Sequence, residues 1–107
     1  MMDLMEKIRE HVKAGDYRFT FHGFERCTER KISPNEIEDV IFSGEIIENY
    51  PRDKYGPSCL VFGITKTGSV LHVQCSIDPV WIITVTPSPL SRQKSGVYLV
   101  HSLTSLP

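Results

Sequence analysis

The sequence predicts an α+β domain in which N-terminal helices pack on a small antiparallel β-sheet. Apolar residues recur at helical spacing up to about residue 43, and from residue 45 they alternate as in strands. The 107 residues are 40% hydrophobic, which suffices for one core but not for two domains. We expect a single domain over residues 1–86, followed by an atypical C-terminal extension over residues 87–107.

The first helix is expected to begin after Asp3, which has Glu6 three residues on, in the capping-box position. Gly15 is expected to end it. Residues 17–21 alternate between apolar and polar side chains and predict a short strand or an extended link.

A second helix is predicted over residues 22–31, with Phe24, Cys27 and Thr28 turned inward. The segment Ser33-Pro34-Asn35-Glu36 then combines a capping residue, a proline in the first turn and a glutamate at the third position. It predicts the start of a third helix, which ends at Ser43-Gly44.

Strands are predicted over residues 45–50, 58–65, 69–77 and 80–86. A two-residue turn at Thr67-Gly68 would join the second and third of these strands. In that register one apolar face is shared by Leu60, Phe62, Ile64, Leu71, Val73 and Cys75. Cys59 and Cys75 would then point to opposite faces, so we expect three free thiols and no disulfide.

Composition excludes several classes of protein. The net charge of −1, without any basic run, argues against a strongly basic nucleic-acid binder. Apolar stretches are too short to span a membrane, and the N-terminus lacks the apolar core of a signal peptide, so we expect a cytoplasmic protein. Cysteine spacing fits no zinc site, and no phosphate-binding or dinucleotide-binding glycine motif occurs, so we expect no metal and no cofactor.

The strongest candidate constellation is His22, Arg26 and Arg30, which share one helical face at four-residue spacing. Two arginines four residues apart repel each other by roughly 0.2–0.5 kcal/mol. They form either a solvated surface compensated by acids such as Glu25 and Glu29, or a fork for phosphate or carboxylate. Spacing alone favours the solvated surface.

A second candidate is His72, in the middle of a predicted strand beside Gln74. It is either an ordinary sheet histidine or, if the second helix packs over that face, a general base or acid near the arginines. The loop after the first strand of the sheet interleaves aromatic and basic residues that suit RNA binding, or else forms ordinary surface: Tyr50, Arg52, Lys54 and Tyr55.

Several segments, taken in order, resemble a small bacterial domain family of unknown function that is similar to RelE/ParE-like toxins, including the BrnT and MqsR branches. The first is the signature His22-x-x-x-Arg26-x-x-x-Arg30-Lys31-Ile32-Ser33. The others are residues 44–51, 56–63, 71–73 and 82–85. The resemblance covers residues 1 to about 86, and its specificity comes from the five segments in order.

This resemblance implies a RelE-like fold and a type II toxin, which cleaves mRNA on or off the ribosome without a metal ion. It places His22, Arg26, Arg30 and His72 at recurrent polar positions, where we expect the catalytic residues. It further implies a partner antitoxin of zinc-ribbon or helix-turn-helix type.

The chain departs from the family pattern at its end. The family usually continues Thr-Val-Tyr-Glu-Pro-Asp-Pro, whereas this chain reads Thr-Val-Thr-Pro-Ser-Pro over residues 84–89. A change of reading frame near residue 86 would explain the departure. The alternative hypothesis is therefore a non-enzymatic binding module or an inactive orphan member on the same fold, which the near-neutral charge favours.

Overall fold

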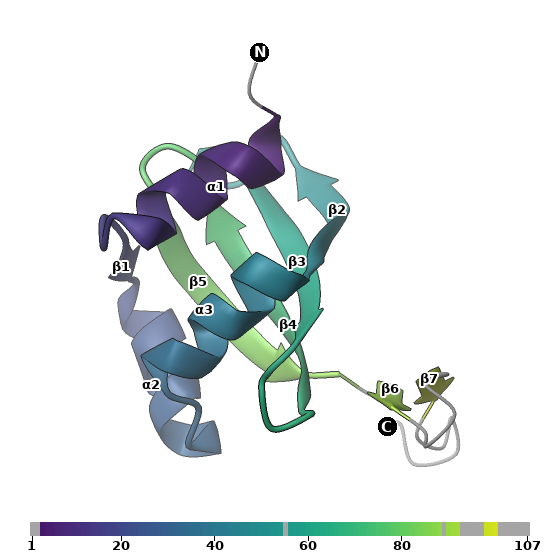
Figure 1. Ribbon diagram of the computed structural model, residues 1–107. Helices are drawn as coiled ribbons and strands as arrows, with labels where there is room; N and C mark the ends of the chain where they lie inside the picture. The colour runs from purple at the N-terminus through teal and green to yellow at the C-terminus, as the bar shows by residue number, and fades with distance from the viewer. Residues whose placement is uncertain (1–2, 55, 89, 93–97, 101–107) are drawn as a thin grey trace.

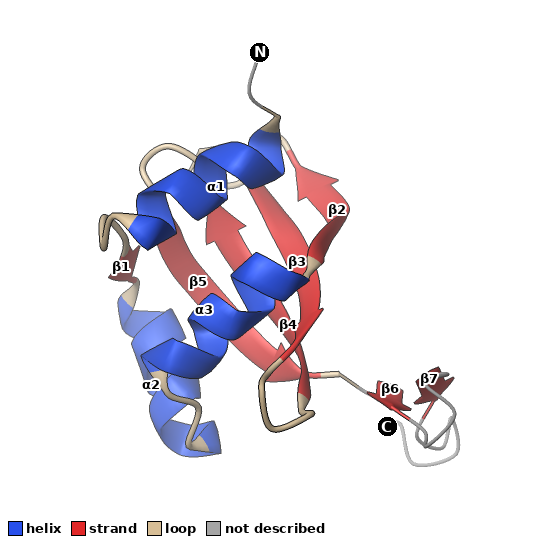
Figure 2. Cartoon of the chain, in the orientation of Figure 1, coloured by secondary structure: helices blue, strands red, loops and turns tan. Residues whose placement is uncertain are grey.

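The computed structural model describes residues 3–54, 56–88, 90–92 and 98–100. Helices α1 (Leu4–Lys13) and α3 (Pro34–Ser43) lie across one face of a five-stranded sheet, and α2 (Phe21–Arg30) lies beside one of its edges (Figure 1). Figure 2 shows the same separation of the helical layer from the sheet. The predicted α+β architecture, with helices packed on a small sheet, is confirmed.

The sheet has the strand order β1-β5-β4-β3-β2. Its strands are β1 (Arg18–Phe19), β2 (Glu45–Tyr50), β3 (Ser58–Ile64), β4 (Val70–Ser76) and β5 (Trp81–Pro87). Neighbouring strands are antiparallel except β1, which runs parallel to β5. The sheet is therefore mixed, because the short link before α2 adds a parallel edge strand to the predicted antiparallel sheet.

Both predicted capping boxes form. The Asp3 carboxylate accepts a hydrogen bond from the Glu6 backbone N–H at 2.8 Å, and the Glu6 carboxylate accepts one from the Asp3 backbone. Ser33 and Glu36 exchange the same pair of bonds at the start of α3. The first and third helices begin as predicted because these side chains satisfy backbone donors that a helix start leaves unpaired.

Helix α2 lies against the edge of β5, which β1 covers only in part. The Thr20 backbone N–H donates to the Ile82 carbonyl at 3.0 Å, and its hydroxyl accepts from the Gly23 N–H at 2.9 Å, which starts the helix at Phe21. A Cβ atom at Gly23 would lie 2.2 Å from the Ile82 carbonyl oxygen. Only glycine fits at this crossing, so Gly23 allows α2 to cover backbone groups that would otherwise form an open edge.

This close approach corrects the predicted orientation of α2. Gly23 and Cys27 face the protein interior, whereas Phe24 is 60% exposed and Phe21 is 78% exposed. Thr28, also predicted to face inward, is exposed. Phe24 was predicted to point inward from its apolar character. The contact with β5 instead rotates the helix toward its smallest residue, and both phenylalanines turn to the outside.

The β3–β4 hairpin closes through three residues, Lys66-Thr67-Gly68, not through the predicted two. The Thr65 N–H donates to the Ser69 carbonyl at 2.8 Å, and Gly68 adopts a φ of +92°, which favours glycine. One extra turn residue shifts the register by one, so Phe62 lies opposite His72. The predicted apolar face is therefore wrong, because a one-residue shift exchanges the two faces.

The same shift corrects the placement of two cysteines. Cys59 lies directly opposite Cys75 on the helix-covered face, and both are fully buried. Directly opposed residues have a Cα spacing that a disulfide can use, so the geometric argument against this pairing fails. Cys59, Cys75 and Cys27 are free thiols in this structure. A hydrogen bond to Cys59, together with burial, raises the pKa of Cys75 and favours its thiol form.

The hydrophobic core lies between the sheet and helices α1 and α3. Its fully buried helical side chains are Ile8, Ile37, Val40 and Ile41. They pack against Val61, Val73, Ile82 and Val85 of the central strands. Within the described residues, the opposite face of β3, β4 and β5 carries no helix (Figure 1).

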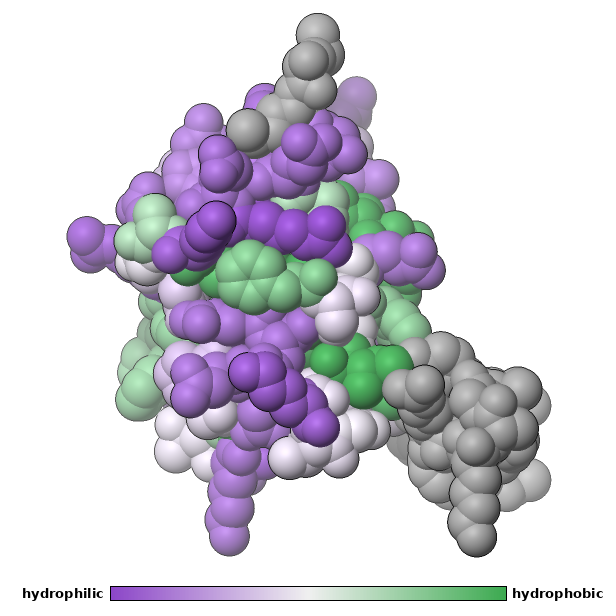
Figure 3. All heavy atoms as spheres, viewed as in Figure 1, coloured by the Kyte–Doolittle hydropathy of each residue, from purple (hydrophilic) through white to green (hydrophobic). Residues whose placement is uncertain are grey.

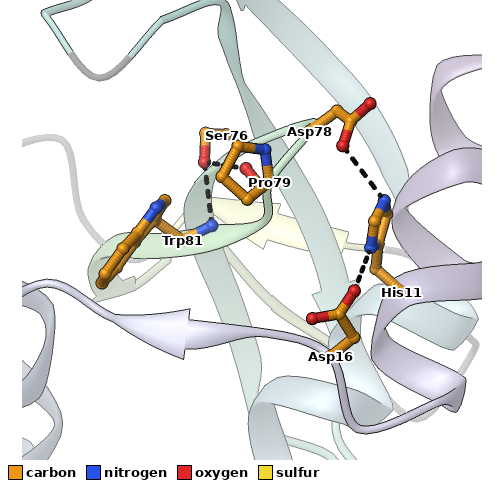
Figure 4. Close-up of polar contacts among 6 residues, drawn as sticks. All are labelled: His11, Asp16, Ser76, Asp78, Pro79 and Trp81. Atoms are coloured by element: carbon orange, nitrogen blue, oxygen red, sulfur yellow. Dashed lines mark hydrogen bonds and ion pairs between the residues drawn. The ribbon is translucent and has the colours of Figure 1, made fainter.

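A histidine joins α1 to the turn between β4 and β5. His11 Nδ1 lies 2.9 Å from the Asp16 carboxylate, and Nε2 lies 3.6 Å from the Asp78 carboxylate (Figure 4). Ser76 Oγ donates to the Pro79 carbonyl at 2.6 Å and accepts a hydrogen bond from the Trp81 backbone N–H at 2.8 Å. The turn is thereby held in shape next to the C-terminal end of α1.

Part of the C-terminal extension forms a separate pair of strands, β6 (Leu90–Arg92) and β7 (Tyr98–Val100). Neither strand joins the main sheet. The domain boundary at residue 86 stays a prediction, although β5 ends at Pro87. In the described part of the chain, no helix is long and apolar enough to cross a membrane.

Candidate functional site

The face of the sheet that faces away from α1 and α3 carries the candidate site, and we call it the outer face. Strand alternation brings the following half-buried side chains to it: Leu60, Phe62, Ile64, His72, Gln74 and Thr84. Core positions on the same strands are apolar, whereas this face mixes aromatic, aliphatic and polar groups. Such a face suits contact with a ligand or partner.

His72 lies near the centre of the outer face. Its ring lies 5.4 Å from the Phe62 ring, centroid to centroid, with the planes tilted by 50°. Burial lowers the pKa of His72, and the negative charge of Glu48 acts in the opposite direction. The net lowering keeps the imidazole neutral at pH 7, in the form that accepts a proton.

Tyr50, at the end of β2, donates its hydroxyl hydrogen bond to the Glu48 carboxylate. This hydrogen bond and burial raise the pKa of Tyr50 to about 12. The tyrosine is therefore a hydrogen-bond donor at neutral pH and not a proton acceptor. Its hydrogen bond fixes the Glu48 carboxylate at the edge of the outer face, where the negative charge acts on His72.

The loop after β2 is fastened to the outer face through Asp53. One carboxylate oxygen of Asp53 accepts from Ser58 Oγ at 2.7 Å and from Gln74 Nε2 at 3.0 Å. A hollow of about 540 Å³ lies there, lined by Asn49, Tyr50, Pro51, Arg52, Asp53 and Gln74. Arg52 and Lys54 are exposed, and Tyr55 lies outside the described residues. The predicted RNA-binding loop is thus positioned against the strand that carries His72.

The residues predicted on α2 are distributed along the edge of β5. Arg30 donates to the backbone carbonyl of Val85. The next residue of β5, Thr86, lies opposite His72. Arg26 pairs with Glu29 on its own helix. His22 is exposed at the other end of α2, about 12 Å along the helix axis from Arg30. Arg30 also lines a hollow with Ile32, Glu36 and Leu71, on the helix-covered side of the sheet. The helix therefore does not bring its three predicted residues together with His72 in one site.

Residues 19–87 match the family model of the domain of unknown function DUF4258. The matched segment is more than half of the chain. The chain belongs to the DUF4258 family. No curated protein and no solved structure matches it.

The DUF4258 match runs from the second residue of β1 to the last residue of β5. It therefore contains α2, α3, the outer face and all the candidate residues, whereas α1 precedes it. The prediction of a small domain family of unknown function is confirmed. Nothing in the match bears on the finer likeness to RelE- and ParE-like toxins.

Sequence reasoning missed three residues of the outer face in this DUF4258 domain: Phe62, Glu48 and Asp53. A two-residue turn would place Phe62 on the apolar face of the hairpin, whereas the three-residue turn places it opposite His72. Glu48 would have been found from the alternation of β2, which sets it on the same side as Tyr50, but the bulge near Ile47 obscures that pattern. Asp53 gives no signal in the sequence, because its partners come from two other strands.

Nothing in the arrangement suggests a built metal centre. Within the part of the chain that the structure describes, no group of three histidine, cysteine or acidic side chains is placed to hold a metal ion. The outer face of the DUF4258 domain presents an imidazole, two carboxylates and a phenol, with cations on the loop beside it.

Proposed function

We propose that the outer face binds single-stranded RNA and that the protein cleaves it without a metal ion, as a toxin-type endoribonuclease of the cytoplasm. The observation that carries this proposal is the half-buried imidazole of His72, which lies 5.4 Å from the Phe62 ring on a sheet face without a covering helix in the described residues. Exposed aromatic side chains on a sheet are a common way to stack unpaired bases. A neutral imidazole is the usual general base at neutral pH.

In the proposed reaction, His72 takes the proton from a ribose 2′-hydroxyl. The 2′-oxygen attacks the adjacent phosphorus and the bond to the 5′-oxygen breaks. The departing 5′-oxygen takes a proton from water, so the products are a 2′,3′-cyclic phosphate and a 5′-hydroxyl. Arg52 and Lys54 lie on the loop next to the face. These cations would offset the charge that develops on the phosphate.

By its resemblance to toxin families, we further propose that a partner antitoxin of zinc-ribbon or helix-turn-helix type holds this activity in check. The expected target is mRNA, free or on the ribosome. Expression of the protein alone should then slow bacterial growth, and His72→Gln should relieve the effect at equal soluble protein.

A non-enzymatic binding module is the second candidate, and specific contacts favour it. Arg26 pairs with Glu29, and Arg30 bonds a backbone carbonyl, so both arginines have structural partners. Glu48 and Asp53 add two carboxylates to the outer face, which would repel phosphates. On this hypothesis the same face binds a protein segment or RNA without cleaving it.

The deciding experiment uses a fluorescently labelled single-stranded RNA in buffer with a metal chelator. We expect cleavage by the wild type and a loss of about 10²- to 10⁴-fold in His72→Gln, the range typical of a general base. RNA binding, measured by fluorescence anisotropy, should survive this substitution. Phe62→Ala should instead weaken binding by about 1–3 kcal/mol, the value of one stacked base.

Two matched variants control for general effects. His11→Gln removes an imidazole on α1, and Phe24→Ala removes an exposed aromatic ring on α2. Both should cleave and bind as the wild type does. Binding without cleavage at any protein concentration would favour the binding module, and the absence of both would exclude a nucleic-acid function for the outer face.

A further inference from the structure

Two of the three cysteines face each other across the middle of the sheet. Cys59 on β3 lies directly opposite Cys75 on β4, and both side chains are fully buried on the helix-covered face. The thiol of Cys75 donates a hydrogen bond to the sulfur of Cys59, so the two sulfur atoms are in contact. Cys27, the third cysteine, lies on α2, which packs against β5. We call Cys59 and Cys75 the dithiol pair.

The Cα spacing of the dithiol pair follows from the register of the hairpin. The Thr65 N–H donates to the Ser69 carbonyl at 2.8 Å, which makes these two residues a hydrogen-bonded pair. Pairs of this type recur at every second position, and the register between β3 and β4 runs without a shift. The dithiol pair is therefore of the same type, with a Cα spacing of about 5.5 Å. A disulfide uses Cα spacings of about 4.4–6.8 Å.

A disulfide in the dithiol pair would nevertheless pull on the two strands. Directly opposed residues have Cβ atoms about 4.5–5.5 Å apart, and hydrogen-bonded pairs lie at the wide end of this range. A disulfide holds its two Cβ atoms only about 3.8 Å apart. A bond that distorts its surroundings in this way is reduced more easily than a relaxed one. The dithiol pair therefore suits reversible oxidation better than permanent cross-linking.

The residues next to the dithiol pair hold the loop after β2. Ser58 directly precedes Cys59, and Gln74 directly precedes Cys75. Ser58 Oγ and Gln74 Nε2 donate to the same carboxylate oxygen of Asp53, at 2.7 Å and 3.0 Å. Movement of the two strands at the dithiol pair therefore changes the spacing of the two groups that fasten the loop.

Access to the dithiol pair comes from the β2 edge of the sheet. The side that carries α1 and α3 presents mainly hydrophilic residues, and both thiols lie beneath it (Figure 3). Asn49 of β2 lies opposite Cys59 and lines a hollow of about 510 Å³ together with Met5 and Ile46. Because β2 is the last strand on its side of the sheet, local opening there can admit a small oxidant to Cys59.

We propose that the dithiol pair is a reversible redox site, which hydrogen peroxide oxidises to a disulfide, and that this disulfide loosens the loop fastened by Asp53. A single buried cysteine is usually inert toward oxidants, but here a second sulfur lies within reach to complete the reaction. The proposal does not rest on RNA cleavage, because it holds whatever the outer face binds.

The proposed oxidation has two steps. The Cys59 thiolate attacks one oxygen of hydrogen peroxide, the O–O bond breaks, and the departing hydroxide takes up a proton, which leaves water and a sulfenic acid on Cys59. The Cys75 sulfur then attacks the Cys59 sulfur, the S–O bond breaks, and the hydroxyl group leaves with the Cys75 proton as a second water. Two thiols are thereby oxidised and one peroxide is reduced.

Protonation favours Cys59 over Cys27 as the first site of attack. The hydrogen bond from Cys75 lowers the pKa of Cys59, which favours the thiolate that starts the reaction. Burial instead raises the pKa of Cys27 and keeps it in the less reactive thiol form. We therefore expect Cys27 to stay reduced while the dithiol pair is oxidised.

The test oxidises the folded, full-length chain with hydrogen peroxide and, after the oxidant is removed, counts the free thiols in denaturant. The count should fall from three to one. The protein should lose the mass of two hydrogen atoms, and peptide mapping should join residue 59 to residue 75. Dithiothreitol should then restore all three thiols.

Variants show which cysteines react. Cys59→Ala and Cys75→Ala should each prevent the disulfide. The matched control is Cys27→Ala, which removes a buried cysteine outside the dithiol pair and should still lose both remaining thiols on oxidation. Thermal unfolding checks that each variant is folded, and peptide mapping of the wild type assigns the bond even where a variant does not fold.

Trypsin reports the effect on the loop, because it cuts after Arg52 and Lys54. Cleavage there should be faster in the oxidised protein than in the reduced one. Asp53→Ala removes the carboxylate that fastens the loop, so it should give fast cleavage in both states. Cleavage after Lys66, in the turn between β3 and β4, serves as the control and should not change.

Several outcomes would overturn the proposal. One is that all three thiols survive oxidation of the folded protein, or that the disulfide forms only in denaturant. Another is a bridge that involves Cys27 or that links two copies of the chain. A bond between Cys59 and Cys75 that leaves cleavage after Arg52 and Lys54 unchanged would refute the effect on the loop.

Discussion

The two faces of the sheet use alternate residues of the same strands and differ sharply. On the helix-covered face, Cys59, Val61, Val73, Cys75 and Val85 have no exposed surface at all. On the outer face, the residues between them include Phe62, His72, Gln74 and Thr84, all half-buried. The first face removes apolar surface from water, whereas the second keeps polar groups within reach of water and of a ligand. Alternate residues of the same strands thus close one side of the layer to water and leave polar groups accessible on the other.

The largest expected effect comes from truncating the same residue type on each face. Ile82, fully buried on the helix-covered face, should lose about 2–5 kcal/mol of unfolding free energy on Ile82→Ala, because the substitution leaves a cavity in a packed core. Ile64→Ala, on the outer face, should cost less than half as much, since that side chain is only half-buried. Urea unfolding followed by circular dichroism measures both. Equal losses would mean that the outer face is covered in solution.

A smaller effect is expected where α2 crosses the edge between the two faces. Gly23→Ala should destabilise the protein by about 1–3 kcal/mol, because the new Cβ atom would meet the Ile82 carbonyl oxygen and push the helix away. In an ordinary helix the same change is stabilising by about 0.8–1.0 kcal/mol. Urea unfolding measures the change in unfolding free energy. A loss on Gly23→Ala would show that the helix rests on the Ile82 carbonyl oxygen, and a gain would show that it does not. Glu25→Ala, at an exposed position on the same helix, serves as the control.

The smallest effect is the pH dependence that His72 gives to stability. Burial lowers its pKa in the folded state, so below about pH 6.5 the unfolded chain binds a proton that the folded chain does not. Stability should therefore fall as the pH falls from about 6.5 through the lower folded-state pKa. In His72→Gln this contribution should vanish, and the difference between the two pH profiles of unfolding free energy isolates it. Parallel profiles would show that His72 is freely solvated.

The helix starts were predictable from sequence because their causes are local. Asp3 with Glu6 and Ser33 with Glu36 are each three residues apart, and each pair satisfies its own backbone donors without help from the rest of the fold. The hairpin between β3 and β4 was predictable as an element for the same reason. Its register was not, because Thr67-Gly68 fits a two-residue turn as well as a three-residue turn, and the choice decides which residues face the helices.

The candidate site was predictable only in part. His72 was identified from its position in a strand, and Tyr50 from the aromatic and basic loop. Glu48, Phe62 and Asp53 escaped because their roles depend on contacts across strands. On α2, the regular spacing of His22, Arg26 and Arg30 did not show which part of the sheet the helix lies against, because that depends on the contact of Gly23 with β5.

The pairing of β1 with β5 also sets the order in which the chain can assemble. Residues 18 and 19 take their places beside residues 81 and 82, and Gly23 rests on the same strand. Both contacts join early and late parts of the sequence, which is the kind of topology that slows folding. During synthesis from the N-terminus, α2 has no docking site until β5 has left the ribosome. The nascent domain therefore stays open at this edge until most of its residues have been made.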